Sequence, residues 1–329
     1  HSLSRASVSR TGFAGAPVTT FPGSMTPFCL TTAPSATMDH SPTSAPMLTT
    51  AFMPTTMSAP IEATNRALQA IQAVRDMPCE KGAAVLGAHM EAPFLCEKYK
   101  GAQLGECLMN PSVEAYEAMT RGTDCVRMMT LATELPGALD MVAYLKARGV
   151  VTCAAHSNAT AEEVHAAADR GLTQITHLFN AQSPLHHRKP GVPGAGLADE
   201  RIIVQAIADG LHLHPDTLRI AALCKGAKGM VLISDSMEAA GMPDGQYDLG
   251  GQAVFVKNGE ARLADGVIAG STIHNMITLA KMPPETVIPM ATSTPADSVG
   301  AKGYGRIEPG ACGVLTLMDA GWNLAGVTA

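Results

Sequence analysis

The sequence predicts an α/β protein built around a (β/α)8 barrel of the TIM type, and two observations support this. From residue 51 onwards, short runs rich in Val, Ile, Leu and Met alternate with helical stretches of about 10 to 15 residues, a pattern typical of a parallel sheet with crossover helices. No glycine-rich phosphate loop follows the first clear strand, which argues against the competing architecture, a doubly wound open sheet.

The alternation defines the elements in order. Strands are predicted at residues 49–55, 84–89, 126–131, 150–155, 174–178, 202–207 and 230–234. The helices between them include residues 62–75, 136–148, 161–170 and 215–225. Ser157 or Thr160 is expected to cap the helix at 161–170, because acidic residues fill its first turn. The remaining barrel strand, the first in order, is expected inside the N-terminal segment.

Composition divides the chain into three parts. Residues 1–50 consist mainly of Ser, Thr, Pro, Ala and Met and carry three formal charges, so we expect this segment to be irregular. Residues 51–300 form the predicted barrel, with a β insertion near 241–270 where DG, GG and NG turns separate short strands. Residues 301–329 predict a C-terminal β segment belonging to a small second domain.

Overall composition excludes several classes of protein. The 329 residues are 46% hydrophobic and 16% charged, so a wholly disordered chain is ruled out. Lys and Arg total 23 against 29 Asp and Glu without a basic run, so we expect no nucleic-acid partner. No apolar run reaches the ~18 residues of a membrane span, so we expect no membrane partner. The eight scattered Cys form no C-x-x-C pair, which is typical of reduced thiols in a cytoplasmic protein.

Polar residues at the ends of predicted strands are the chemical signal. They are His89 with Glu91, His156, His177 and Asp235. In a barrel the carboxyl ends of the strands line the active site, so these side chains are expected to converge. Two imidazoles and a carboxylate, with a second carboxylate nearby, suit zinc or a similar divalent metal. Each residue alone also has a structural interpretation, and the role of His89 stays open.

A second group of polar residues follows two later strands of the predicted barrel. It comprises Asn180, His187, Arg188, Lys189, His212 and His214. Their hydrogen-bond donors would suit an anionic group, and the alternative is a solvated basic loop.

Six segments also carry a resemblance to a known family: GAHMEAPF, AAHSNATAEE, THLFNAQSPLHHRKPG, IADGLHLHP, LISDSMEAAGMPDGQYDLGG and LADGVIAGST. In this order, between Phe52 and Pro309, they resemble the N-acetylglucosamine-6-phosphate deacetylases of the amidohydrolase superfamily. The resemblance implies a metal-bearing barrel beside a small β-sandwich built from both chain ends. In this chain we expect the N-terminal part of that sandwich to be degraded. It further implies hydrolysis of N-acetylglucosamine 6-phosphate to glucosamine 6-phosphate and acetate by a cytoplasmic homodimer.

The resemblance implies a role for each matching residue. Glu91, His156 and His177 would hold one divalent metal ion, zinc in the first place, with iron or cobalt able to use the same ligands. Asp235 would be the general base. The substrate would be bound by Asn180, Ala181, Arg188, His212 and Gln103, and a neighbouring subunit would complete the phosphate site.

The chain departs from that family's pattern at several positions. The segment PGSMTPFCLTTAPS has Phe28 and Leu30 where the family usually has two metal-binding histidines, which removes the option of a second metal. Ala92 and Ala155 replace glycines, and Gln103 replaces a histidine that faces the substrate. Two alternatives therefore stay open: a catalytically impaired sugar-phosphate-binding protein, and another amidohydrolase that acts on a cyclic amide.

Overall fold

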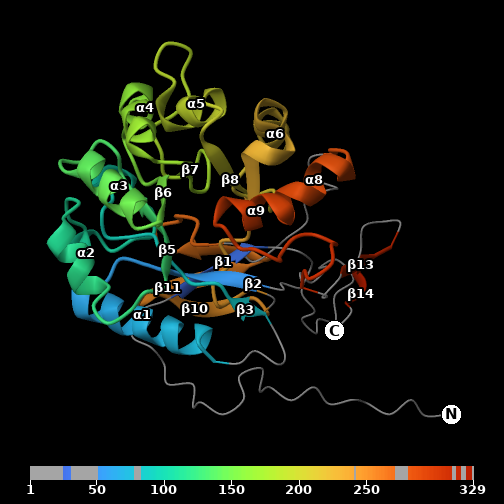
Figure 1. Ribbon diagram of the computed structural model, residues 1–329, viewed down its shortest axis with the longest axis horizontal. Coiled ribbons are helices and arrows are strands. Elements are labelled where there is room, and N and C mark those ends of the chain that lie inside the picture. Colours follow the sequence, from blue (N-terminus) through green and yellow to red (C-terminus); the bar gives the residue numbers. More distant parts are fainter. Residues whose placement is uncertain are drawn as a thin grey trace.

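A curled parallel sheet forms the centre of the molecule, with helices along its outer side (Figure 1). The computed structural model describes residues 25–30, 51–77, 83–240, 242–270, 281–312, 316–319 and 324–327. The parallel strands are β2 (Ala51–Thr56), β3 (Ala84–Val85), β4 (Ala88–Met90), β5 (Val126–Leu131), β6 (Val151–Ala154), β7 (Gln174–Ile175), β8 (Ile203–Ile207) and β9 (Met230–Ile233). Each lies where the alternating pattern predicts a strand, and the carboxyl ends of all of them lie at one edge.

The predicted strand at 84–89 is divided into β3 and β4, which pair with different parts of β2. Gly87 lies between them with φ +146°, and a Cβ there would lie 2.4 Å from the carbonyl oxygen of Cys125. The close approach of the neighbouring backbone thus requires glycine and interrupts the strand.

The strand β1 (Met25–Leu30) corrects the expectation that the first barrel strand lies in the N-terminal segment and runs parallel to the others. It does lie beside β2, inside the N-terminal segment, but it runs antiparallel. Pro27 has no backbone N–H, and proline in a sheet is confined to edge strands or irregular positions, which agrees with β1 at the end of the sheet order. β1 also approaches β9, so the sheet curls back towards its own far edge.

The helices are α1 (Ile61–Arg75), α2 (Val113–Met119), α3 (Ala138–Ala147), α4 (Ala161–Arg170), α5 (Gly191–Ala198), α6 (Pro215–Gly229), α8 (Pro284–Ala291) and α9 (Ser293–Ser298). Two short 3-10 helices, η1 (Glu97–Tyr99) and η2 (Gly105–Cys107), lie in the loop after β4. At α4 the cap is Thr160, whose hydroxyl accepts from the Glu163 N–H while Glu163 bonds back to the Thr160 N–H. None of the described helices is long and apolar enough to cross a membrane.

Two small antiparallel sheets accompany the central one. One of them lies within residues 241–270 and consists of β10 (Gly245–Leu249), β11 (Gln252–Lys257) and β12 (Glu260–Leu263). Its apolar face buries Leu249 and Val254 against Met57 and Met237, so it packs over the ends of β2 and β9. Near the C-terminus, β13 (Thr316–Met318) pairs with β14 (Leu324–Val327). A sandwich that joins both chain ends stays a prediction, because most of residues 1–50 lies outside the described residues.

Candidate metal centre and active-site cavity

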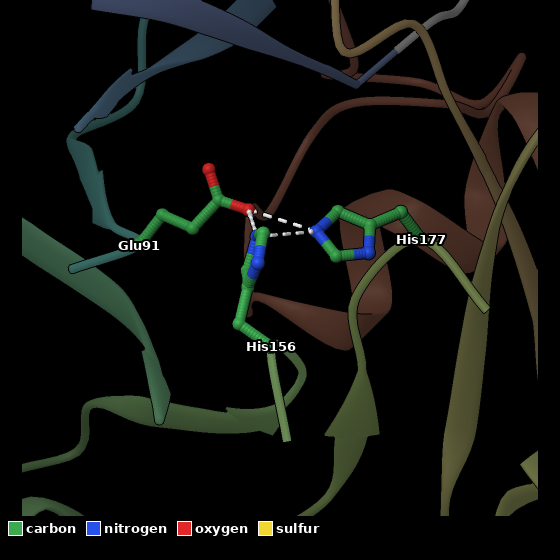
Figure 2. Close-up of side chains that lie close together, drawn as sticks. All are labelled: Glu91, His156 and His177. Atoms are coloured by element: carbon green, nitrogen blue, oxygen red, sulfur yellow. Dashed lines mark hydrogen bonds and ion pairs between the residues drawn. The ribbon is translucent and has the colours of Figure 1, made fainter. Parts of the chain in front are cut away.

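Three side chains meet at the carboxyl ends of the strands. Glu91 directly follows β4, and His156 and His177 each lie two residues beyond the ends of β6 and β7. Glu91 Oε1 lies 3.1 Å from His156 Nε2 and 2.9 Å from His177 Nε2, and the two nitrogens are 3.1 Å apart (Figure 2). All three residues are buried. Among the residues that the structure describes, this is the group of His, Cys, Asp and Glu able to share a metal ion.

Backbone carbonyls fix the Nδ1 hydrogen of both imidazoles. His156 Nδ1 lies 2.8 Å from the Tyr99 carbonyl oxygen, and His177 Nδ1 lies 3.1 Å from that of Asn180. A carbonyl oxygen can only accept, so each Nδ1 carries a hydrogen, and Nε2 is the atom that each ring, in its neutral form, would offer to a metal ion. Such a second hydrogen bond is the usual way in which a metal-binding histidine is oriented.

The donor set fits a divalent cation. Donor atoms sharing a zinc ion at about 2.0–2.1 Å lie about 3.3–3.6 Å from each other in tetrahedral or trigonal-planar arrangements. The separations of 2.9–3.1 Å are a few tenths of an ångström shorter, so little movement would be needed. Three such atoms this close repel one another unless a proton or a metal ion lies between them.

The charges in the cluster agree with that interpretation. Burial raises the pKa of Glu91, but its hydrogen bonds to the two imidazoles outweigh this and hold the pKa well below its usual range. Burial lowers the pKa of His177, whereas the hydrogen bond and charge of Glu91 raise it, with a net increase. The carboxylate is therefore anionic and draws positive charge towards itself.

Backbone strain is concentrated at the same place. His156, His177 and Asp235 have φ of 47°, 33° and 46°, and Phe179 and Ala181 have φ of 75° and 50°. Non-glycine residues seldom adopt positive φ, and such residues are often found at functional sites where the surrounding structure enforces them. Here the strained positions follow β6, β7 and β9, where the chain turns sharply to aim these side chains inwards.

Asp235 follows β9 beside the cluster and is partly exposed to the cavity. Removal from bulk water raises the pKa of its carboxyl group, and the negative charge of Glu91 adds to the increase. A carboxyl group whose pKa lies above its usual value is suited to accept and return a proton near neutral pH.

The cluster and Asp235 line a cavity of about 560 Å³. Its wall includes four of the predicted substrate-binding residues, Gln103, Asn180, Ala181 and His212. His212 Nδ1 lies 2.6 Å from Asp209 Oδ2, so this ring is held with Nε2 available to the cavity. Burial raises the pKa of Asp209, but its bonds to His212 outweigh this and lower it, so Asp209 is a counter-charge for that imidazole.

Other predicted residues lie elsewhere. Arg188 is exposed, does not line the cavity, and has Nη1 2.7 Å from His187 Nε2. Lys189 and His214 are exposed as well. His89 is buried between the hydroxyls of Thr55 and Thr130, at 3.3 and 2.8 Å.

Burial lowers the pKa of His89 to about 4, so its ring is neutral near pH 7. His89 is therefore a structural residue inside the barrel.

Sequence reasoning named Gln103 but missed the rest of its loop, residues 97–102, which lines one side of the cavity. Lys98 and Lys100 line it, and Tyr99 contributes through its carbonyl oxygen. The two lysines in EKYKGAQ, directly after the Glu91 motif, were a usable signal. The role of the Tyr99 carbonyl oxygen left no signal in the sequence, because every residue type has a backbone carbonyl.

A parallel barrel-like sheet with a Glu/His/His cluster and an aspartate at the carboxyl ends of its strands is typical of a metal-dependent hydrolase. Comparison with known proteins agrees. The model of the Amidohydrolase family matches residues 35–327. The chain belongs to the amidohydrolase family.

Two relatives and one solved structure show which members of the family the chain is similar to. It is 37% identical over 281 residues to the N-acetylgalactosamine-6-phosphate deacetylase of Escherichia coli O157:H7, covering 83% of this chain and 74% of the relative. It is 37% identical over 283 residues to the N-acetylglucosamine-6-phosphate deacetylase of Vibrio furnissii, covering 84% and 70%. Its structure is similar to that of an aspartate-to-alanine mutant of N-acetyl-D-glucosamine-6-phosphate deacetylase from Mycobacterium smegmatis in complex with N-acetyl-D-glucosamine-6-phosphate. The TM-score is 0.77 at 30% identity, covering 85% of this chain and 75% of that one.

Proposed function

We propose that the protein hydrolyses the acetamide bond of N-acetylglucosamine 6-phosphate, releasing acetate and glucosamine 6-phosphate. The observation that carries this proposal is the buried cluster of Glu91, His156 and His177, which lines one cavity together with Asp235. The names of the relatives supply the substrate class.

The cluster would hold one divalent metal ion, with zinc as the first candidate. When bound, such an ion supplies Lewis acidity, which polarises a carbonyl group and lowers the pKa of water from about 15.7 towards about 7. The chain's part is to present three donor atoms from three strand ends in one small volume. Iron and cobalt accept the same ligands, so metal analysis decides the identity.

Asp235 would move the proton. It takes a proton from the attacking water as the new C–O bond forms, and the amide carbon becomes tetrahedral. It then gives the proton to the nitrogen as the C–N bond breaks, so the amine leaves neutral. A raised pKa suits both halves of this transfer, because the group must be a base first and an acid afterwards.

The walls of the cavity would hold the sugar phosphate. His212, oriented by Asp209, and the side chain of Asn180 with the backbone at Ala181 offer polar groups. Gln103 also reaches the cavity wall. Contacts far from the amide bond contribute to the rate by orienting it over the cluster.

The relatives do not decide between the two epimers of the sugar at C4, because relatives of the same identity are named for the glucosamine and the galactosamine compounds. We propose N-acetylglucosamine 6-phosphate as the preferred substrate. Comparison of kcat/KM for the two epimers decides it, and a higher value for the galactosamine compound would reverse the assignment.

An acetate-release assay tests the reaction itself. We expect the zinc-loaded protein to release acetate from N-acetylglucosamine 6-phosphate, and the unphosphorylated sugar to be a poorer substrate by at least about tenfold in kcat/KM, because phosphate contacts orient the amide. Absence of acetate release from a metal-loaded preparation would support a sugar-phosphate-binding protein instead. Preferential hydrolysis of a cyclic amide would support the other amidohydrolase activity.

The variant Asp235→Asn tests the proton transfer. We expect turnover to fall by at least about 10²–10⁴-fold, the usual contribution of general acid–base catalysis, while metal content stays nearly unchanged. If activity survives within tenfold of the wild type, Asp235 is not the base.

A further inference from the structure

Gln103 is buried, at 3% exposure, between the Glu91 carboxylate and the chain that follows β2. Its Oε1 accepts a hydrogen bond from the backbone N–H of Ser58 at 2.7 Å, and its Nε2 donates to Glu91 Oε2 at 3.3 Å. The Ser58 N–H can only donate, so the amide oxygen must face it. That fixes the orientation of the amide and directs the NH2 group towards Glu91.

The two oxygens of Glu91 therefore face different partners. Oε1 faces the Nε2 atoms of His156 and His177, whereas Oε2 faces the Gln103 amide. A carboxylate with one oxygen engaged in this way is hindered from turning to offer both oxygens to the same ion. A hydrocarbon side chain at position 103 would remove this restraint, and a carboxylate there would repel Glu91.

The segment that carries Gln103 also orients a second member of the cluster. The carbonyl of Tyr99 accepts from His156 Nδ1, and Gly101 lies so close to that ring that an added Cβ would be 3.4 Å from Cε1. The loop is attached to the end of β2, because the Leu104 N–H donates to the Ser58 hydroxyl. One loop thus sets the position of Glu91 and of His156.

We infer that Gln103 is a positioning residue of the metal centre, which restricts Glu91 to ligation through Oε1 and thereby raises metal affinity. The inference rests on the proposed function only in taking Glu91, His156 and His177 as metal ligands. It gives Gln103 a role that a histidine could not fill in the same way, because imidazole has no carbonyl oxygen to accept from Ser58.

The test measures metal binding directly. Zinc dissociation constants of the full-length wild type and of Gln103→Leu are obtained by competition with a chromophoric chelator. Removal of a group that supports a metal ligand typically costs 10–100-fold in affinity, and because the bond to Glu91 is long we expect about tenfold. Gln103→Glu keeps an acceptor for Ser58 but adds a negative charge beside Glu91, so a loss of affinity there comes from the altered contact with Glu91.

The visible spectrum of the cobalt-substituted protein gives a second reading. In Gln103→Leu we expect weaker absorption, since a carboxylate that ligates through both oxygens raises the coordination number. The matched control is Gln252→Leu, which removes a 2.6 Å bond from Gln252 Nε2 to the Ala102 carbonyl of the same loop without touching the cluster. Its zinc affinity should stay within about threefold of the wild type.

Wild-type affinity and an unchanged cobalt spectrum in Gln103→Leu would overturn the inference. Equal losses in Gln252→Leu would also overturn it, because they would show that the loop matters and the amide does not. If Gln103→Leu does not fold, Gln103→Glu decides by the same two measurements. Failure of the proposed function is distinct, since it is a lack of acetate release by a wild type that binds zinc.

Discussion

Several residues other than glycine around the metal centre have positive φ. Ala181 is the simplest of them in which to consider the effect of this strain on stability. It has φ 50° on the loop after β7 and contributes its backbone to the cavity wall. For an L-residue the left-handed region costs roughly 1–2 kcal/mol relative to the right-handed one. The structure retains that cost where the chain must turn sharply to place His177 and Asn180.

Ala181→Gly should therefore stabilise the fold. Glycine removes the strain but adds flexibility to the unfolded chain, so we expect the free energy of unfolding to rise by about 0.5–1 kcal/mol. Urea denaturation measures it. As a control, Ala167→Gly inside α4 should lower stability by about 1 kcal/mol. A destabilised Ala181→Gly would show that the site carries no strain at this position.

The sequence predicts Glu91, His156, His177 and Asp235 as site residues, because polar residues at the ends of apolar strands have a regular position in a barrel. It does not predict that Gln103 faces Glu91 or that Asp209 faces His212, since these pairs depend on how loops fold over the sheet. Arg188 is placed by resemblance in the phosphate site, whereas a single chain leaves it on an exposed loop.

At the level of elements, periodicity predicts the strands and the longer helices, and α4 and β5 begin and end at the predicted residues. The sequence leaves α5 unassigned, because GVPGAGLA contains glycines and a proline that disfavour a helix. Tertiary contacts outweigh this propensity: Val192 and Ala195 are buried, and the Ser183 hydroxyl accepts from the Val192 N–H at 3.0 Å. A tertiary contact also divides β3 from β4, because the backbone carbonyl of Cys125 lies close to Gly87.

Asp199 at the end of α5 links this helix to α4. Its carboxylate bonds to Arg201, and its Oδ2 lies 3.1 Å from His165 Nδ1 on α4. The Arg201 guanidinium is the main cause of a pKa well below the usual range for Asp199. Because the folded-state pKa is lowered, this carboxylate contributes stability above its unfolded value of about 3.9 and loses it as the pH falls further.

Asp199→Asn should thus lower the free energy of unfolding by about 1 kcal/mol or less at pH 7, since Arg201 is about half exposed and solvent screens the pair. Below pH 4 the difference between variant and wild type should shrink. Urea denaturation from pH 7 to pH 3 measures both. Parallel curves over this range would contradict the assignment.

At the level of the whole molecule, the cavity beside the Glu91, His156 and His177 cluster is shared between the barrel and the β insertion. Leu249 and residues 265, 267, 268 and 270 of the insertion line the cavity together with Glu91 and Asp235. In Figure 1, β10 and β11 lie close to β2, which agrees with the apolar cluster that Leu249 and Val254 share with Met57, the residue after β2. The insertion therefore closes one side of a site whose chemical groups come from the barrel.

The exposed position of Arg188 suits a homodimer in which each chain offers this guanidinium to the phosphate site of the other. We expect a dimer in sedimentation velocity. Arg188→Ala should raise KM for N-acetylglucosamine 6-phosphate by about tenfold or more, the loss of one charge-assisted contact, with little change in kcat. An unchanged KM would remove Arg188 from the phosphate site, and a monomer that retains full activity would exclude the shared site.

Metal stoichiometry shows whether Glu91, His156 and His177 form a metal site. Metal-free protein is dialysed to equilibrium against zinc, and bound metal is counted by mass spectrometry. We predict one zinc ion per chain in the wild type and in His187→Ala, whose ring lies on an exposed loop, and a loss of zinc in His156→Ala and His177→Ala. A wild type that binds no zinc, iron or cobalt, or histidine variants that bind as much as the wild type, would contradict the account.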